Sequence, residues 1–204
     1  RGHVERSTVL RVRYADDLLV VGEQERLVDR GDGYVIGDQV EGRFEAFLRD
    51  QKLRVDIPAV RRADGSLTYL PDQAPPAVRP GERVEVDVAV RNLGVGHTFP
   101  GGTNDSNEGW LEVSATDEGG RLLALSGAIR PDGYVDPDAH FYKALMVDRH
   151  GQAIHQRNAQ DIVAPVYVRV IGPGTADAAH FRFRLPQAYS GASVTFKARL
   201  RWRK

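Results

Sequence analysis

The chain has 204 residues, of which 41% are hydrophobic and 27% are charged, a composition typical of a globular protein with a sizeable core. Its 28 basic and 28 acidic residues give a net charge of zero, which excludes a nucleic-acid binder with a strongly basic surface. No run of 18 apolar residues occurs, which excludes a transmembrane helix. The absence of cysteine excludes disulfides, thiolate metal sites and the Cys-x-x-Cys-His motif that attaches c-type haem. Because the sequence begins Arg-Gly-His, we expect a piece of a longer polypeptide.

Residues 1–77 show weak periodicity, and we expect them to form an N-terminal extension. Two short apolar segments, 8–14 and 18–21, predict a hairpin. Apolar residues at helical spacing between residues 40 and 50 predict one short helix. Residues 53–57 then alternate between apolar and polar, and the stretch that follows is rich in Gly, Asp and Pro, as in a loop at a domain boundary.

Residues 78–204 contain the clearest period-two patterns, and we expect them to form an immunoglobulin-like antiparallel β-sandwich. In 83–92 a valine occupies every second position, and Asp-Glu-Gly-Gly between 110–116 and 121–125 predicts a hairpin. The other segments with apolar residues at alternate positions are 166–171, with three inward-facing valines, 181–185 and 194–203. The residues expected to share one core are Val86, Val88, Phe183, Phe196, Leu200 and Trp202.

A Gly-rich loop at residues 92–110 and a second polar stretch before Phe141 carry the candidate site residues, which are His97, Asp105, Glu108 and His140. Loops that join the strands of a sandwich gather at its two ends, so we expect these four side chains to line one polar site. Imidazole and carboxylate groups suit zinc, copper or another first-row metal ion. No closely spaced pair of histidines is present, however, and hydrogen bonds within each loop would satisfy the same residues. The residue types leave both interpretations open.

Signals for catalysis are weak. Ser126 lies in Leu-Ser-Gly without the Gly-x-Ser-x-Gly context of a hydrolase nucleophile. Gly94 and Gly96 lack the following lysine and the strand-to-helix context of a phosphate-binding loop. We therefore expect no catalytic residue and no enzymatic activity in this chain alone.

Several short motifs follow one another in a specific order. They are Val-Arg-Pro-Gly-Glu (78–82), Gly-His-x-Phe-Pro-Gly-Gly (96–102), Asp-x-x-Glu-x-Trp-Leu-Glu-Val (105–113), Ser-Gly (126–127), Asp-Pro-x-Ala-His (136–140) and Arg-Asn (157–158). This series resembles the C-terminal, haem-free, β-rich region of bacterial multihaem c-type cytochromes. The resemblance covers about residues 36–204.

The resemblance implies an exported protein, periplasmic or at the cell surface, that works with a haem-bearing domain or cytochrome chain in electron transfer. Because this chain has no cysteine, a neighbouring domain or chain would supply the haem. The resemblance also implies that His97 faces or ligates that haem. The leading hypothesis is a non-catalytic accessory domain that covers haems or docks a partner. The alternatives are a stand-alone metal- or ligand-binding β-sandwich and a structural module without a ligand.

Overall fold

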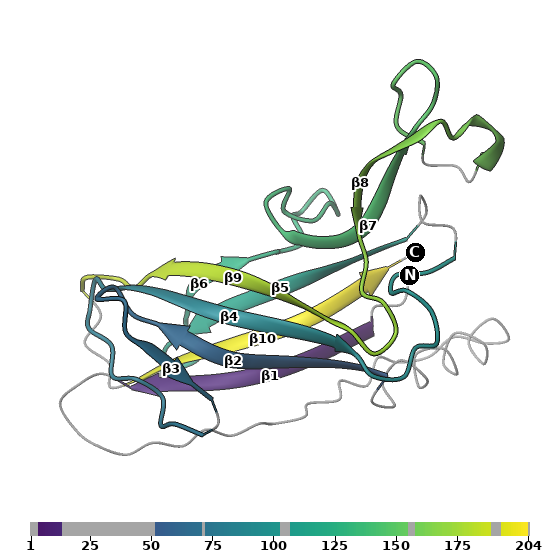
Figure 1. Cartoon of the computed structure of the whole chain (residues 1–204). Helices are drawn as coiled ribbons and strands as arrows, with labels where there is room; N and C mark the ends of the chain where they lie inside the picture. The colour runs from purple at the N-terminus through teal and green to yellow at the C-terminus, as the bar shows by residue number, and fades with distance from the viewer. Residues whose placement is uncertain are drawn as a thin grey trace, which may run out of the picture.

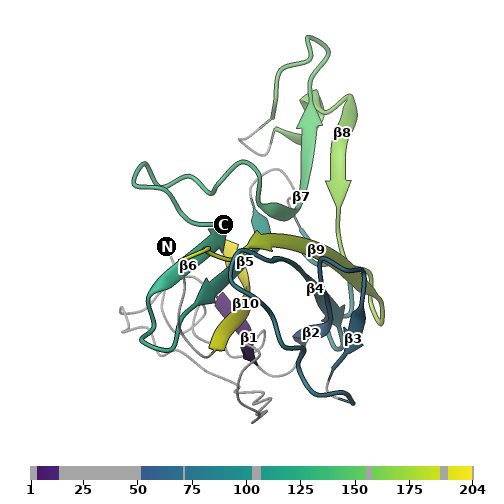
Figure 2. The ribbon, with the colours of Figure 1, turned by 90° about the vertical axis from the view of Figure 1, so that its left-hand side faces the viewer.

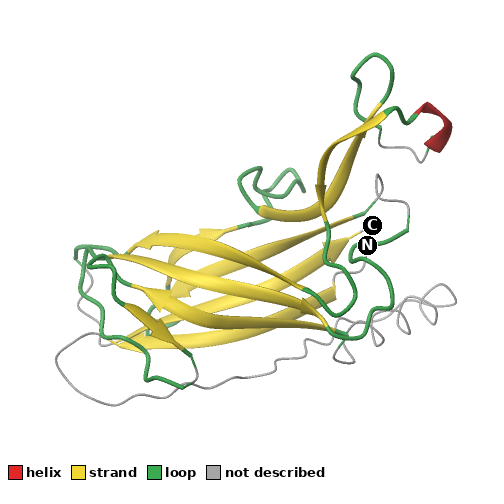
Figure 3. Cartoon of the chain, in the orientation of Figure 1, coloured by secondary structure: helices red, strands yellow, loops and turns green. Residues whose placement is uncertain are grey.

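The computed structural model describes residues 4–13, 52–70, 72–102, 107–154, 158–188 and 193–203, and the backbone alone for the first of these ranges. The second strand of the hairpin expected at 18–21 and the helix expected between 40 and 50 lie outside the described residues. The strands are β1 (Val4–Arg13), β2 (Leu53–Arg61), β3 (Leu67–Tyr69), β4 (Arg83–Asn92), β5 (Glu108–Thr116), β6 (Leu122–Ser126), β7 (His140–Val147), β8 (Ala164–Arg169), β9 (Ala176–Arg184) and β10 (Ser193–Arg203). A short 3-10 helix, η2 (Ala159–Asp161), precedes β8 (Figure 3).

In the described part of the chain these strands form two antiparallel sheets packed face to face, which confirms the predicted β-sandwich (Figure 1). One sheet has the order β1-β10-β5-β7-β8, with β6 also paired to β5, and the other has the order β3-β2-β4-β9. Three strands that precede residue 78 belong to these sheets, because β1 pairs with β10 and β2 pairs with both β3 and β4. Strands from both sides of the expected domain boundary therefore build the sandwich.

The core lies between the two sheets and follows the alternation in the sequence. All four alternating valines of β4 are fully buried, and Phe196 of β10 is fully buried opposite Phe183 of β9, with 5.5 Å between their ring centroids. Leu200 is also buried, and Trp202 is half-buried against the same cluster. Each large apolar side chain removed from water contributes roughly 1.5–3 kcal/mol, so this cluster is the main source of stability.

Two strands pair with different parts of the same edge of β5. The C-terminal half of β5 pairs with β6, and its N-terminal residues 109–111 pair with the start of β7. The segment between β6 and β7 crosses Trp110, whose indole Nε1 donates to the carbonyl of Gly127 at 3.0 Å. Gly127 has a φ of +78°, and a Cβ atom there would collide with the carbonyl oxygen of Leu111. Only glycine fits this position without a shift of the backbone.

Beyond residue 142, β7 leaves the sandwich and pairs with β8, forming a projection that we call the β7–β8 arm (residues 143–169). Figures 1 and 2 show the arm extending past the edge of the four-stranded sheet. On the arm Val163, Val166 and Val168 are 66%, 58% and 55% exposed. The expectation that Val166 and Val168 face the core is therefore wrong, because the second sheet does not extend over this part of the first.

Candidate functional site

The described residues bring a group of polar side chains together where the arm joins the sandwich. β7 begins at His140, which pairs in register with the fully buried Leu111 of β5, so its ring points between the sheets. The ring centroid lies 5.2 Å from that of Tyr142 and 6.5 Å from that of Phe181 on β9. A pocket of about 380 Å³ opens beside it. Its lining consists of Ser126, Asp138, Ala139, His140, Arg169, His180, Phe181, Arg182 and Phe183.

His140 lies between an acidic and a basic side chain that come from two other strands. Its Nε2 is 2.9 Å from Oδ2 of Asp177 on β9, and its Nδ1 is 2.8 Å from Nη1 of Arg169 at the end of β8. A guanidinium only donates hydrogen bonds and a carboxylate only accepts them. The arrangement therefore fits a neutral imidazole that donates from Nε2 to Asp177 and accepts at Nδ1 from Arg169. Both ring nitrogens are used, so His140 joins β7, β8 and β9 and is not available to a metal ion in this arrangement.

The surroundings of His140 favour the same protonation state. Burial lowers the pKa of His140, the hydrogen bond to Asp177 partly opposes this effect, and the charge of Arg169 lowers the pKa further. Burial also raises the pKa of the neighbouring phenol of Tyr142, and the charge of Asp177 adds to that effect. The hydroxyl of Tyr142 is buried near Asp177, yet among the described residues it forms no hydrogen bond of acceptable geometry. At neutral pH the imidazole of His140 and the phenol of Tyr142 are therefore both uncharged.

His97 lies in the Gly-rich loop and is exposed. Its Nδ1 is 2.7 Å from the carbonyl oxygen of Thr98. A carbonyl only accepts, so Nδ1 of His97 is the donor of this hydrogen bond. A hydrogen bond from the other ring nitrogen is what orients histidines that ligate metals. The structure thus shows one hydrogen bond that orients the His97 ring, and ligation of a haem iron by this residue stays a prediction.

The loop that carries His97 is fixed to the base of the arm. The side-chain amide of Asn92, a fully buried residue, donates to the carbonyls of His97 at 3.0 Å and Ile171 at 3.2 Å. The backbones of Phe99 and Ile171 pair through two hydrogen bonds of 2.9 and 2.8 Å. Since Ile171 follows shortly after β8, the loop after β4 and the arm lie at the same end of the sandwich (Figure 1).

The other residues of the expected four-residue site have different surroundings. Glu108 pairs with Nζ of Lys143 at 3.2 Å and with Nε of Arg203 at 2.7 Å. Side chains alternate along β5, so Glu108 lies on the outer face of the sheet, whereas His140 lies on the inner face beside Leu111. The structure thus brings His140 together with Asp177 rather than with Glu108. Asp105 lies outside the described residues, and the four-residue metal site stays a prediction.

Sequence reasoning did not identify Asp177 and Arg169, which are 37 and 29 positions away from His140. One signal for Asp177 is present in the pattern of β9. It occupies the same alternate positions as the buried Ala179, Phe181 and Phe183. A carboxylate on the inward face of a strand requires a polar partner, because an unpaired charge is costly to bury.

Comparison with known proteins yields one similarity between structures. No family model matches the chain, and no curated protein sequence matches it. Among solved structures the chain is similar to a penta-haem cytochrome c552 from Thermochromatium tepidum, with 18% sequence identity and a TM-score of 0.43. The similarity covers 70% of this chain and 29% of that chain. Within the described residues, no helix is long and apolar enough to span a membrane.

Proposed function

We propose that this chain is a non-catalytic accessory domain of an exported multihaem c-type cytochrome system, and that it docks a haem-bearing domain or chain. The observation that carries the proposal is the β7–β8 arm, on which three valines and Ile162 are exposed beyond the sandwich. Clustered exposed apolar side chains mark interaction surfaces in soluble proteins. The series of sequence motifs points to multihaem cytochromes as the class of partner.

The His140 cluster supports a docking role because it fixes the base of the arm. Arg169 is the last residue of β8 and Asp177 lies near the start of β9, and His140 connects them. An arm that is held in one orientation loses less conformational entropy when it binds a partner. In this proposal the cluster positions the docking surface and carries out no reaction.

His97 supplies the contact with haem in the proposed complex. It is exposed at the same end of the sandwich as the arm, with Nδ1 bound to the Thr98 carbonyl. A partner seated against the arm would place its haem edge near this loop. Haem bound covalently to the partner explains how a chain without cysteine takes part in electron transfer. In this proposal the protein is located in the periplasm or at the cell surface.

Binding to a multihaem c-type cytochrome purified from the same organism tests the docking role. We expect saturable binding by the wild-type chain and a loss of at least about tenfold in affinity for the Val166→Asp/Val168→Asp variant. The matched control is Leu122→Asp, because Leu122 is a 53% exposed apolar residue on β6 in the body of the sandwich. Equal binding by the two variants, or no binding by the wild-type chain, would contradict the proposal.

Visible absorption of the complex tests the role of His97 separately. If Nε2 ligates haem iron, complex formation shifts the Soret band. The His97→Ala variant should then lose this shift and still bind the cytochrome through the arm. His150→Ala is the control, since His150 is exposed within the arm. An unchanged Soret shift in His97→Ala rules out ligation by this residue. The docking role is tested independently by the binding experiment with the Val166→Asp/Val168→Asp variant.

A further inference from the structure

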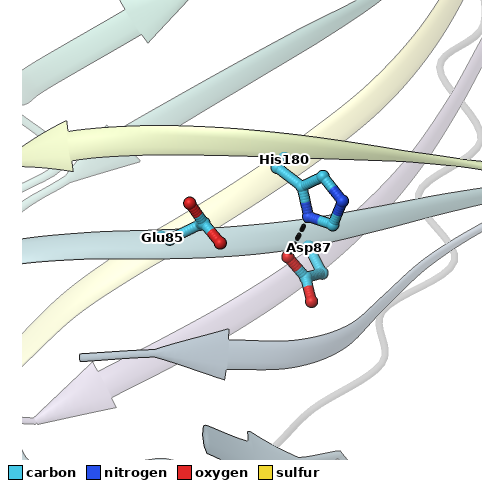
Figure 4. Close-up of side chains that lie close together, drawn as sticks. All are labelled: Glu85, Asp87 and His180. Carbon is cyan, nitrogen blue, oxygen red and sulfur yellow. Dashed lines mark hydrogen bonds and ion pairs between the residues drawn. The ribbon is translucent and has the colours of Figure 1, made fainter. Parts of the chain in front are cut away.

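The geometry points to a divalent metal site on the outer face of the four-stranded sheet, formed by Glu85, Asp87 and His180 (Figure 4). Glu85 and Asp87 are two positions apart on β4 and therefore lie on the same face. His180 on β9 lies directly opposite Asp87 in the register of the two strands. One ligand atom from each residue lies within 4.8 Å of the others. The three residues lie outside the exposed apolar surface of the arm, although His180 also lines the pocket beside His140.

The donor set suits a first-row transition metal such as Zn²⁺. One imidazole nitrogen and two carboxylate oxygens provide three ligands, and a water molecule completes a tetrahedron. Ligand atoms of a tetrahedral Zn²⁺ ion lie about 3.3 Å apart, given metal–ligand bonds of about 2.0–2.2 Å. Nδ1 of His180 now forms a 2.6 Å hydrogen bond with Oδ1 of Asp87, so a metal ion would displace the proton between them and separate the two atoms to about 3.3 Å. A small rotation of the ring admits a metal ion in place of that proton.

The sheet holds the two carboxylates in place and leaves the imidazole accessible. The side chains of Glu85 and Asp87 are 15% and 17% exposed, whereas that of His180 is 57% exposed. Two of the three ligands are thus positioned before the ion arrives, and the ion has an open path beside the imidazole. Such preorganisation lowers the entropic cost of binding.

Two arginines form ion pairs with the carboxylate of Glu85 and would compete with the metal ion for it. Nε of Arg182 lies 2.5 Å from Oε2, and Nε of Arg61 lies 3.4 Å from Oε1. The side chains of Arg182 and Arg61 are 71% and 44% exposed, so each remains hydrated when it is displaced. Exposed ion pairs contribute little to stability, and their loss is a small barrier to metal binding.

A purely structural role makes a different prediction for these residues. Asp87 and His180, and likewise Glu85 and Arg182, are directly opposed in the register, as in ordinary cross-strand ion pairs. Under that interpretation the removal of Arg182 has no effect on metal affinity, because there is no site. Under the metal proposal, removal of this competing cation strengthens binding. Arg182→Gln therefore separates the two interpretations.

Calorimetric titration of the metal-free full chain with Zn²⁺ tests the site. We expect one ion per chain, affinity at least about tenfold weaker in Asp87→Asn and in His180→Gln, and stronger binding in Arg182→Gln. His150→Gln is the matched control, since His150 is also an exposed histidine. Circular dichroism without metal verifies that each variant is folded. If Asp87→Asn fails to fold, His180→Gln and Arg182→Gln still decide the question.

Three results would overturn the proposal. The first is the absence of saturable Zn²⁺ binding by the wild-type chain. The second is undiminished binding in His180→Gln, which would place the ion at other residues. The third is unchanged or weaker binding in Arg182→Gln, which would show that this guanidinium does not compete with the ion.

Discussion

β4 and β8 share the same local pattern of alternating valines and occupy opposite environments. Val86 and Val88 of β4 are fully buried, whereas Val166 and Val168 of β8 are more than half exposed. β4 lies between β2 and β9, and the other sheet covers its inner face. β8 is the last strand in the path of its sheet and lies on the arm, beyond the four-stranded sheet.

The different burial of these valines shows that a period-two pattern identifies a strand but does not indicate which of its faces another layer covers. The pattern is a property of a few neighbouring residues, and coverage depends on a second layer that is remote in the sequence. In β8 the exposed valines accompany Pro165, which removes one backbone donor. Proline at this place is typical of edge strands that are protected from the addition of another strand. We therefore expect a partner to contact the side chains of the arm rather than its backbone edge.

The largest effect on the free energy of unfolding is expected in the core between the two sheets. Phe196→Ala removes a fully buried ring that packs against Phe183 and should cost about 3–5 kcal/mol in the free energy of unfolding. Tyr134→Ala, at a ring that is 65% exposed, should change it by less than about 0.5 kcal/mol. Urea denaturation measures both values. Similar losses for the two variants would contradict the assigned core.

A second test compares two glycines with the same backbone conformation and different surroundings. Gly127 and Gly133 have φ values of +78° and +80°, but only at Gly127 would a Cβ atom collide with a backbone oxygen. Gly133→Ala should cost about 1 kcal/mol, from the left-handed conformation alone. Gly127→Ala should cost at least about 3 kcal/mol, because the chain over Trp110 must shift as well. Thermal unfolding of the two variants should differ clearly, and equal melting temperatures would refute the close approach at Leu111.

A third test applies one substitution to both strands of the comparison. Val86→Ala should cost about 2 kcal/mol, because it removes two buried methyl groups and leaves a cavity. Val168→Ala should change the free energy of unfolding by less than about 0.5 kcal/mol. The difference should appear in the denaturation midpoint with little change in the slope. A comparable loss in Val168→Ala would mean that something covers the arm in the isolated chain.

The smallest effect concerns pH and compares two histidines. Burial holds the pKa of His140 in the folded chain below its unfolded value of about 6.5. Between these two values the unfolded chain binds a proton that the folded chain does not, so stability falls as the pH drops through this range. From about pH 7.5 to about pH 5.5, wild type should therefore lose more stability than His140→Gln does. His150→Gln, at an exposed position, should keep the wild-type pH dependence, and the loss of that dependence in this variant would contradict the assignment to His140.

Local pattern was sufficient to predict much of the sandwich. The alternation in β4, β9 and β10 and the turn between β5 and β6 are properties of consecutive residues, and the structure confirms these elements. The turns before β4 and β9 contain Gly81 and Gly174 with φ values of +76° and +69°, and each glycine follows a proline, as is typical of a tight reversal of the chain. The sequence also singled out His97, since it stands within a long Gly-rich loop.

The tertiary structure alone decided which surfaces are covered and which polar groups meet. The burial of Trp110 depends on the segment that crosses it, and the exposure of β8 depends on where the opposite sheet ends. The partners of His140 are decided in the same way, because Asp177 comes from the other sheet and Arg169 from the far strand of the arm. Alternation constrains each strand separately, whereas these contacts depend on the register between strands and on the packing of one sheet against the other, which no local spacing encodes.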